Sequence, residues 1–222
     1  MKREITVNDL IRITKGKLVI GEENEVCEKI SFDTRELEEN DTYMGIKGQK
    51  IDGSTLWKEA FEQGAKIAIV ENTNFTYGEI AKYQAQGKVI IKVDDTIKAL
   101  AQLAEYKRKL YDIPVVGVTG SVGKTSTKDI IASVLSQKYN TLKTEGNNNN
   151  HLGLPKTILR LKNEKAAVIE MGMNNFGEIE TLTNIAKPTL SVITNIGTSH
   201  IGKLGSRQNI LKAKLEILQG ME

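Results

Sequence analysis

The chain has 222 residues, enough for one large domain or two modest ones, and its 39% hydrophobic and 27% charged residues are ordinary for a globular protein. Its 31 basic and 28 acidic residues are spread along the sequence and leave a net charge of +3, so we expect no nucleic-acid partner. No apolar run approaches the roughly 18 residues that cross a bilayer, which predicts a cytoplasmic protein without membrane insertion. The single cysteine, Cys27, can form no internal disulfide.

The first half of the chain is predicted to form a small mixed α/β domain. Apolar residues recur at helical spacing over residues 6–13, 54–62 and 96–111. Residues 29–32, 67–70 and 89–93 are expected to be extended. Because the last of these helices ends ahead of Pro114, we place a boundary near Asp112 and expect domains over residues 1–112 and 113–222.

The second half alternates between apolar strands and helical segments, a pattern typical of a parallel sheet with flanking helices. The strands are expected over residues 115–118, 166–171 and 190–196. Helices are expected after Thr125 and over residues 178–186 and 208–218. In such a sheet the segments that follow the strands lie at one edge, where ligands bind.

A glycine-rich turn ending in Gly123-Lys124-Thr125 follows the first strand of this half. Glycines let backbone N–H groups close around phosphate oxygens, and the helix that follows presents its positive end to them. Lys124 would neutralise the β- and γ-phosphates of a nucleotide, and the Thr125 hydroxyl would reach Mg²⁺. Val118 stands where the usual pattern has glycine, so this is a variant loop, and a tight strand-to-helix connection is the alternative interpretation.

Two further strands lead to side chains suited to metal binding. Glu170 ends an apolar run, where an unpaired carboxylate is costly unless it meets a cation, so it is a candidate Mg²⁺ ligand opposite Thr125. His200, one of only two histidines, lies in the loop after the last expected strand. A solvent-facing glutamate and a structural histidine are the alternative interpretations.

The last helix carries a lysine within an apolar face. Burial would lower the pKa of the Lys214 amine and make its nitrogen more nucleophilic. A side chain that keeps its ammonium group in water is the alternative. At about 100° per residue, the apolar residues expected around Lys214 are Ile210, Leu211, Leu215, Ile217 and Leu218.

Several spaced motifs follow one another through the second half. They occupy residues 119–125, 144–155, 170–174 with 177–179, 195–200, 205–206 and 213–217. Together they resemble the Mur ligases, the ATP-dependent enzymes that assemble the peptide of bacterial cell-wall precursors. The resemblance covers nearly the whole chain and is strongest to the branch that adds D-alanyl-D-alanine to UDP-N-acetylmuramoyl-tripeptide.

The first half carries matching motifs at residues 31–35, 45–48 and 52–53. In the family this region holds the UDP-sugar end of the substrate. Thr34 stands where serine is common and Ser54 where histidine is common, and ordinary turn residues are the alternative interpretation. The substrate-binding residues that the resemblance implies here are Thr34, Arg35, Gly48 and Asp52.

Carried over position by position, the resemblance also assigns roles in the second half. The residues implied to be catalytic are Lys124, Lys214 and His200. The implied ATP-binding residues are Gly120, Ser121, Gly123, Lys124, Thr125 and Ser126. The implied Mg²⁺ ligands are Thr125, Glu170, His200 and a carbamylated Lys214. The asparagine run would add substrate contacts from Asn147 and Asn150.

The implied reaction transfers the γ-phosphoryl group of ATP to the substrate carboxylate, and the amine of D-alanyl-D-alanine then attacks the acyl phosphate. Family members are longer than this chain and are expected to be monomers. The resemblance therefore implies an amino-terminal domain followed by a truncated central ATP-binding domain. A ligase that adds the third amino acid, and a nucleotide-binding fragment without catalysis, are the alternatives.

Overall fold

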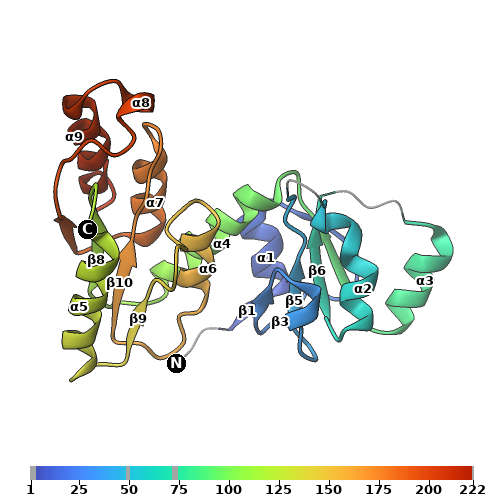
Figure 1. Ribbon diagram of the computed structural model, residues 1–222. Helices are drawn as coiled ribbons and strands as arrows, with labels where there is room; N and C mark the ends of the chain where they lie inside the picture. The colour runs from blue at the N-terminus through green and yellow to red at the C-terminus, as the bar shows by residue number, and fades with distance from the viewer. Residues whose placement is uncertain (1–3, 49–50, 72–74, 222) are drawn as a thin grey trace. The chain divides into compact units, whose positions relative to one another are not determined.

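The computed structural model describes residues 4–48, 51–71 and 75–221 (Figure 1). The chain divides into two compact units, Met1–Leu103 and Ala104–Glu222. The division falls within helix α4 (Thr96–Lys109), whereas the sequence places the boundary just after this helix. Each unit contains its own sheet.

The first unit is built on a mixed five-stranded sheet. Its elements are β1 (Ile5–Thr6), α1 (Val7–Thr14), β2 (Lys17–Ile20), β3 (Val26–Cys27), β4 (Ile30–Ser31), β5 (Thr42–Met44), α2 (Trp57–Glu62), β6 (Ile67–Val70), α3 (Tyr77–Ala85) and β7 (Val89–Lys92). The strand order is β2-β7-β6-β5-β4, in which β4 to β7 run parallel and β2 is antiparallel to β7. Every residue of β6 is buried, which explains its uniformly apolar sequence.

The second unit is built on a four-stranded parallel sheet. Its elements after α4 are β8 (Val115–Thr119), α5 (Lys124–Ser136), β9 (Thr141–Lys143), α6 (Gly153–Leu159), β10 (Ala166–Glu170), α7 (Glu178–Ala186), β11 (Leu190–Ile193), α8 (Ile201–Leu204) and α9 (Arg207–Leu215). The strand order is β11-β8-β10-β9. The connection after β8 leads to β9 at one side of the sheet, whereas the connection after β10 leads to β11 at the other side. The neighbouring strands β8 and β10 therefore mark the point where the connections reverse direction, which is where open α/β sheets bind ligands.

The predicted fold class, a mixed α/β domain followed by a P-loop-type parallel sheet with flanking helices, is confirmed. The predicted strand over residues 67–70 and helix over residues 178–186 coincide with β6 and α7. The sequence misses β5 and β9 because three residues are too few for a periodic signal. It misses α6, which follows the asparagine run and has Pro155 in its first turn.

The apolar face predicted for the last helix is wrong for three leucines. Leu211, Leu215 and Leu218 are 40%, 40% and 52% exposed. Two apolar stripes run side by side along this segment, which comprises α9 and the 3₁₀ turn η3 (Glu216–Leu218). The stripe that contains the small residue Ala213 packs toward α7. The buried stripe recurs at i, i+3, i+4 and i+7 and consists of Ile210, Ala213, Lys214 and Ile217.

A buried arginine fastens the end of α4 to the end of α7. Arg108 is only 4% exposed. Its guanidinium donates to the carbonyls of Ala186 at 2.8 Å and Lys187 at 3.0 Å. It also donates to the Tyr111 carbonyl at 2.6 Å. The cation thus satisfies carbonyls at the negative end of the α7 dipole, where positive charge is favoured.

We expect Arg108→Met to lower the free energy of unfolding by about 3 kcal/mol, because several buried carbonyls lose their donor. Urea denaturation followed by circular dichroism measures the change. The matched control is Lys109→Met, which removes an exposed pair with Glu105 and should change the stability by about 0.5 kcal/mol or less. Equal effects of the two substitutions would contradict this account of Arg108.

Candidate functional site

In the first unit, the residues predicted to bind substrate follow two neighbouring strands. Thr34 and Arg35 lie in the 3₁₀ turn η1 (Thr34–Glu36) after β4, and Gly48 and Asp52 lie in the segment after β5. Because β4 and β5 are parallel partners, both segments begin at the same edge of the sheet.

Carboxylates hold the first of these segments in place. The Thr34 hydroxyl donates to the Glu59 carboxylate at 2.6 Å, and no sequence pattern predicts this contact between residues 25 positions apart. The Arg35 guanidinium donates through two nitrogens to the Asp33 carboxylate, which raises the pKa of Arg35. The Arg35 side chain is still 84% exposed, so its charge remains available to a ligand.

The second segment is held by backbone contacts around a buried tyrosine. The Asp52 carboxylate accepts from the Ser54 amide at 2.9 Å, and the Gly48 amide donates to the Ile51 carbonyl at 2.9 Å. The buried Tyr43 hydroxyl donates to the backbone of this segment at 2.8 Å. Burial, followed by the negative charges of Glu59, Asp33 and Asp52, raises the pKa of Tyr43 to about 12.

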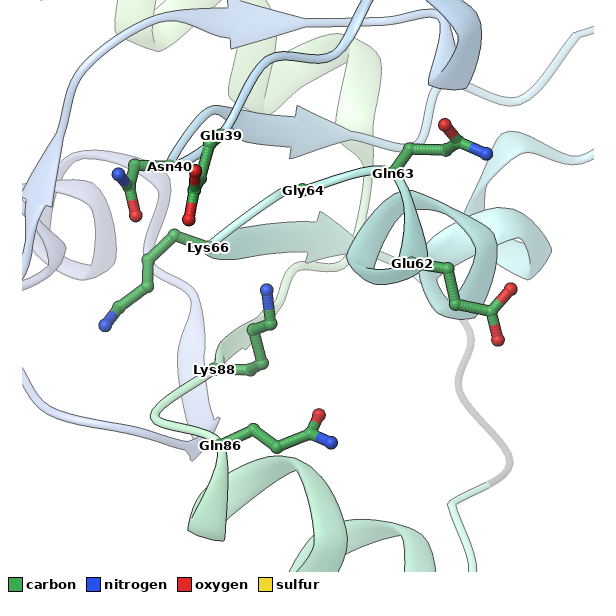
Figure 2. A pocket seen from close by; sticks show the side chains of 8 residues that line it. All are labelled: Glu39, Asn40, Glu62, Gln63, Gly64, Lys66, Gln86 and Lys88. Carbon is green, nitrogen blue, oxygen red and sulfur yellow. The ribbon is translucent and has the colours of Figure 1, made fainter.

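A polar pocket of about 480 Å³ lies at the opposite end of the same sheet (Figure 2). Its lining includes Lys66 and Lys88, which directly precede the parallel strands β6 and β7. Each lysine already has a partner: Lys66 pairs with Glu25 at 3.2 Å, and Lys88 donates to the Ala65 carbonyl at 2.7 Å. The predicted substrate residues are not among its described lining residues, so this pocket and the Thr34–Asp52 region are separate.

In the second unit, polar segments follow all four parallel strands and meet at one edge. The glycine-rich loop follows β8, Thr144 follows β9, Glu170 ends β10, and Thr194 follows β11. Because the strands are parallel neighbours, the sheet itself brings these distant segments together.

The glycine-rich loop has the backbone form of a phosphate cradle. Gly120 has a φ of 153°, and a Cβ there would lie 1.8 Å from the Thr194 hydroxyl oxygen. Gly123 has a φ of 81° and begins α5 without a side-chain cap, so the first amides of the helix keep no side-chain acceptor. The Lys124 ammonium folds back to the Gly120 carbonyl at 3.0 Å, and Ser126 is exposed on the first turn.

The segment after β11 clamps this loop from the side. The Thr194 hydroxyl and the Asn195 amide donate to the Val122 carbonyl at 2.7 and 3.1 Å. The Ser121 hydroxyl, in turn, accepts from the Gly197 amide at 2.9 Å. The loop is therefore held in its cradle shape by protein contacts alone, and the sequence assigned no such role to Thr194 or Asn195.

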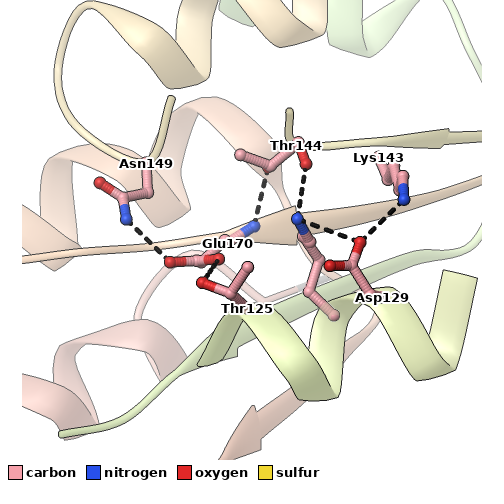
Figure 3. A network of polar contacts seen from close by, with 7 residues as sticks. Thr125, Asp129, Lys143, Thr144, Asn149 and Glu170 are labelled. Atoms are coloured by element: carbon pink, nitrogen blue, oxygen red, sulfur yellow. Dashed lines mark hydrogen bonds and ion pairs between the residues drawn. The ribbon is translucent and has the colours of Figure 1, made fainter. Parts of the chain in front are cut away.

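Two candidate metal ligands, Thr125 in the first turn of α5 and Glu170 at the end of β10, are in contact (Figure 3). The Thr125 hydroxyl donates to the Glu170 carboxylate at 3.0 Å, and the other Glu170 oxygen accepts from the Asn149 amide at 2.8 Å. Glu170 is 2% exposed, and among the described residues it forms no ion pair. This is a buried carboxylate with hydroxyl and amide neighbours and without a protein cation.

The other predicted residues have different surroundings. Asn150 accepts from the Leu152 and Gly153 amides at 3.0 and 2.9 Å and so supports the start of α6, while Asn147 is exposed. Within the asparagine run it is Asn149 that reaches Glu170, a distinction that four identical neighbours conceal in the sequence. His200 is exposed, has a φ of 65° and precedes α8.

Lys214 is 2% exposed, as its predicted burial requires. Among the described residues its ammonium group has no hydrogen bond or ion pair. Burial, and then repulsion from the Lys124 charge, lowers the pKa of Lys214 to about 8. Lys214 and Lys124 therefore lie within electrostatic range of each other, although they are far apart in the sequence.

Comparisons with known proteins identify the family. A model described as "Mur ligase family, catalytic domain" matches residues 27–108, and one described as "Mur ligase middle domain" matches residues 118–222. The chain belongs to the Mur ligase family. Among the described residues, this Mur ligase chain has no helix long and apolar enough to cross a membrane.

Relatives agree over nearly all of the Mur ligase chain. The UDP-N-acetylmuramoyl-tripeptide–D-alanyl-D-alanine ligase of Bacillus subtilis is 41% identical over 98% of this chain and 46% of the relative. The crystal structure of MurF from Acinetobacter baumannii has a TM-score of 0.87 at 34% identity, over 99% of this chain and 47% of that one. MurF from Thermotoga maritima in complex with ADP has a TM-score of 0.77 at 34% identity, over 88% and 44%. The chain spans about half the length of the relatives it matches.

We expect Lys214→Met to stabilise the Mur ligase chain at pH 7, and the gain to shrink as the pH rises. The folded pKa of about 8 lies below the ordinary value of 10.5, so the unfolded state binds more protons between these values and stability rises with pH there. The difference in free energy of unfolding between variant and unaltered chain should fall by about 3 kcal/mol from pH 7 to pH 10.5.

Urea denaturation across this pH range, in carbonate-free buffer, measures the difference. Lys212→Met is the matched control, because Lys212 is an exposed lysine on the same helix. A pH-independent difference for Lys214→Met would show that the Lys214 ammonium is not buried in solution.

Proposed function

We propose that this chain forms the substrate-binding and nucleotide-binding part of a ligase that joins D-alanyl-D-alanine to UDP-N-acetylmuramoyl-tripeptide with ATP. The observation that carries the proposal is the preformed glycine-rich loop beside the buried Thr125–Glu170 contact. The names of the relatives support the choice of substrates. The 222 residues cover about half of those relatives, so the proposal concerns a shared site and not the whole reaction machinery.

The second unit would bind ATP at the loop after β8. The uncapped amides at the start of α5 suit the phosphate oxygens, and Lys124 supplies a positive charge beside them. The residues in this role are Gly120, Ser121, Gly123, Lys124, Thr125 and Ser126. The ADP in the similar Thermotoga maritima structure supports this assignment.

Magnesium fits the donors present at this edge. Thr125 and Glu170 offer hydroxyl and carboxylate oxygens, the ligand type that Mg²⁺ prefers, and the buried Glu170 carboxylate lacks a protein cation. Mg²⁺ bound there would offset negative charge on the phosphates during transfer. His200 and Lys214 are the further ligands that we propose.

Lys214 would serve in this role as a carbamate. Its neutral amine attacks carbon dioxide, a C–N bond forms, and the nitrogen loses a proton, which converts a buried cation into an anion. The lowered pKa of Lys214 supports this step, because more of the amine is neutral near pH 8. Intact-protein mass spectrometry under carbon dioxide with chemical trapping of carbamates tests this assignment.

The first unit would hold the UDP end of the acceptor. Arg35 presents an exposed cation to a diphosphate, and Asp33 fixes its direction. The Thr34 hydroxyl, Gly48 and Asp52 follow strands that end at the same edge of the sheet. In the reaction, the γ-phosphoryl group of ATP passes to the terminal carboxylate of the acceptor, the dipeptide amine attacks that carbon, and phosphate leaves.

The direct experiment is to incubate the chain with Mg-ATP, UDP-N-acetylmuramoyl-tripeptide and D-alanyl-D-alanine. Mass spectrometry then detects ADP and the ligated product. Product formation establishes the ligase, and nucleotide binding without product defines a binding unit that needs the rest of its relatives' length. If the chain binds neither ATP nor UDP-N-acetylmuramoyl-tripeptide, the proposal is overturned.

We expect Lys124→Ala to weaken the binding of Mg-ATP by at least about tenfold, because one charge-assisted contact is worth about 1.5–3 kcal/mol. Isothermal titration calorimetry measures the dissociation constant. Lys162→Ala, at an exposed lysine in the same unit, should leave it unchanged. Binding that is equally strong in both variants would remove Lys124 from the nucleotide site.

A further inference from the structure

We propose that Lys128 is a positioning residue, which holds Glu170 and Asn149 in place for Mg²⁺ by anchoring Thr144. The inference deepens the proposed function and rests on it. Lys128 lies one helical turn beyond Lys124 on α5 and is 2% exposed, although lysine is rarely buried without a specific partner.

Its ammonium group is directed at the end of the neighbouring strand. Lys128 donates to the Thr144 carbonyl at 2.9 Å in a buried hydrogen bond. It also contacts the Asp129 carboxylate at 3.2 Å, which is shared with Lys143 at 2.8 Å. The Thr144 contact is the one that leads toward the candidate metal ligands.

The Thr144 hydroxyl connects Lys128 to Glu170. The Glu170 amide donates to the Thr144 hydroxyl oxygen at 2.9 Å, while the Glu170 carboxylate accepts from Thr125. The contacts therefore form a closed ring, from Lys128 to Thr144, to Glu170, to Thr125 and back along α5. Figure 3 shows the part of this ring formed by Thr144, Glu170 and Thr125. A ring that returns to the same helix fixes the carboxylate relative to the glycine-rich loop.

The hydrogen bond from Lys128 to Thr144 also holds the start of the loop that carries Asn149. Thr144 is the first residue after β9, and Asn149 lies five residues further along the chain. Asn149 is then tied at its far end, where its carbonyl accepts from the Gly172 amide at 2.8 Å. Lys128 at one end and Glu170 with Gly172 at the other thus hold this loop over the carboxylate.

A merely structural lysine would stabilise the fold without affecting this geometry. The first measurement is therefore hydrogen exchange of the Glu170 and Gly172 amides in nucleotide-free protein. We expect Lys128→Met to accelerate exchange at both amides while amides in β11 keep their protection. Lys143→Met is the matched control, because it removes a lysine from the same Asp129 carboxylate but keeps the hydrogen bond from Lys128 to the Thr144 carbonyl. It should leave both amides protected.

The second measurement is the Mg²⁺ concentration that gives half of the full increase in ADP affinity, determined by calorimetry. We expect Lys128→Met to raise it about tenfold and to leave ADP affinity in EDTA unchanged, as for groups that orient metal ligands. Thr144→Val should act similarly, because it removes the acceptor for the Glu170 amide. The double variant should be little worse than either single variant, since both break one route.

The outcomes separate the two proposals. If the unaltered chain shows no Mg²⁺-dependent ADP binding, the proposed function fails. If it binds, but Lys128→Met leaves the amide exchange and the Mg²⁺ dependence unchanged, the positioning role alone is overturned. Should Lys128→Met not fold, Thr144→Val carries the test, and unchanged Mg²⁺ dependence in that variant overturns the role.

Discussion

The organisation of the second unit depends on a buried carboxylate at the end of a central strand. Glu170 is enclosed by sheet neighbours, so its charge must be met by hydrogen bonds or a cation. The carboxylate accepts from Thr125 and Asn149, while the Glu170 amide donates to the Thr144 hydroxyl, so these contacts come from two segments, one after β8 and one after β9. Each of these segments begins at the end of a parallel strand, and the strand order therefore decides which side chains meet.

The same sheet edge also explains why the loop is rigid before any ligand binds. Thr194 and Asn195 satisfy the Val122 backbone from the side, and Gly120 leaves room for the Thr194 hydroxyl. A loop fixed in this way loses little conformational entropy when it binds an anion. Preorganisation here comes from the strand beside the loop as well as from its glycines.

The sequence predicts the elements with strong periodicity and the residues that belong to a spaced motif. It singles out Lys124, Thr125, Glu170 and Lys214 as candidates, because each stands out against its local pattern. It does not reveal Asn149, Lys128 or Thr194, since their importance comes from partners 16 to 72 residues away. The error on α9 has a related cause: periodicity shows two apolar stripes but not which of them faces α7.

Two electrostatic deficits in the second unit are complementary. Glu170 is a buried anion without a protein cation, whereas Lys214 is a buried cation that is repelled by Lys124. Each of these charges lowers the stability of the fold, because each is buried without a partner of opposite sign. Mg²⁺ would bring positive charge to Glu170, and the carbamate proposed for Lys214 would replace its cation with an anion that also faces the metal, so both deficits would be relieved together. A ligand that relieves an unfavourable buried charge gains part of its affinity from that relief, which links the charges of Glu170 and Lys214 to the Mg²⁺ that we propose.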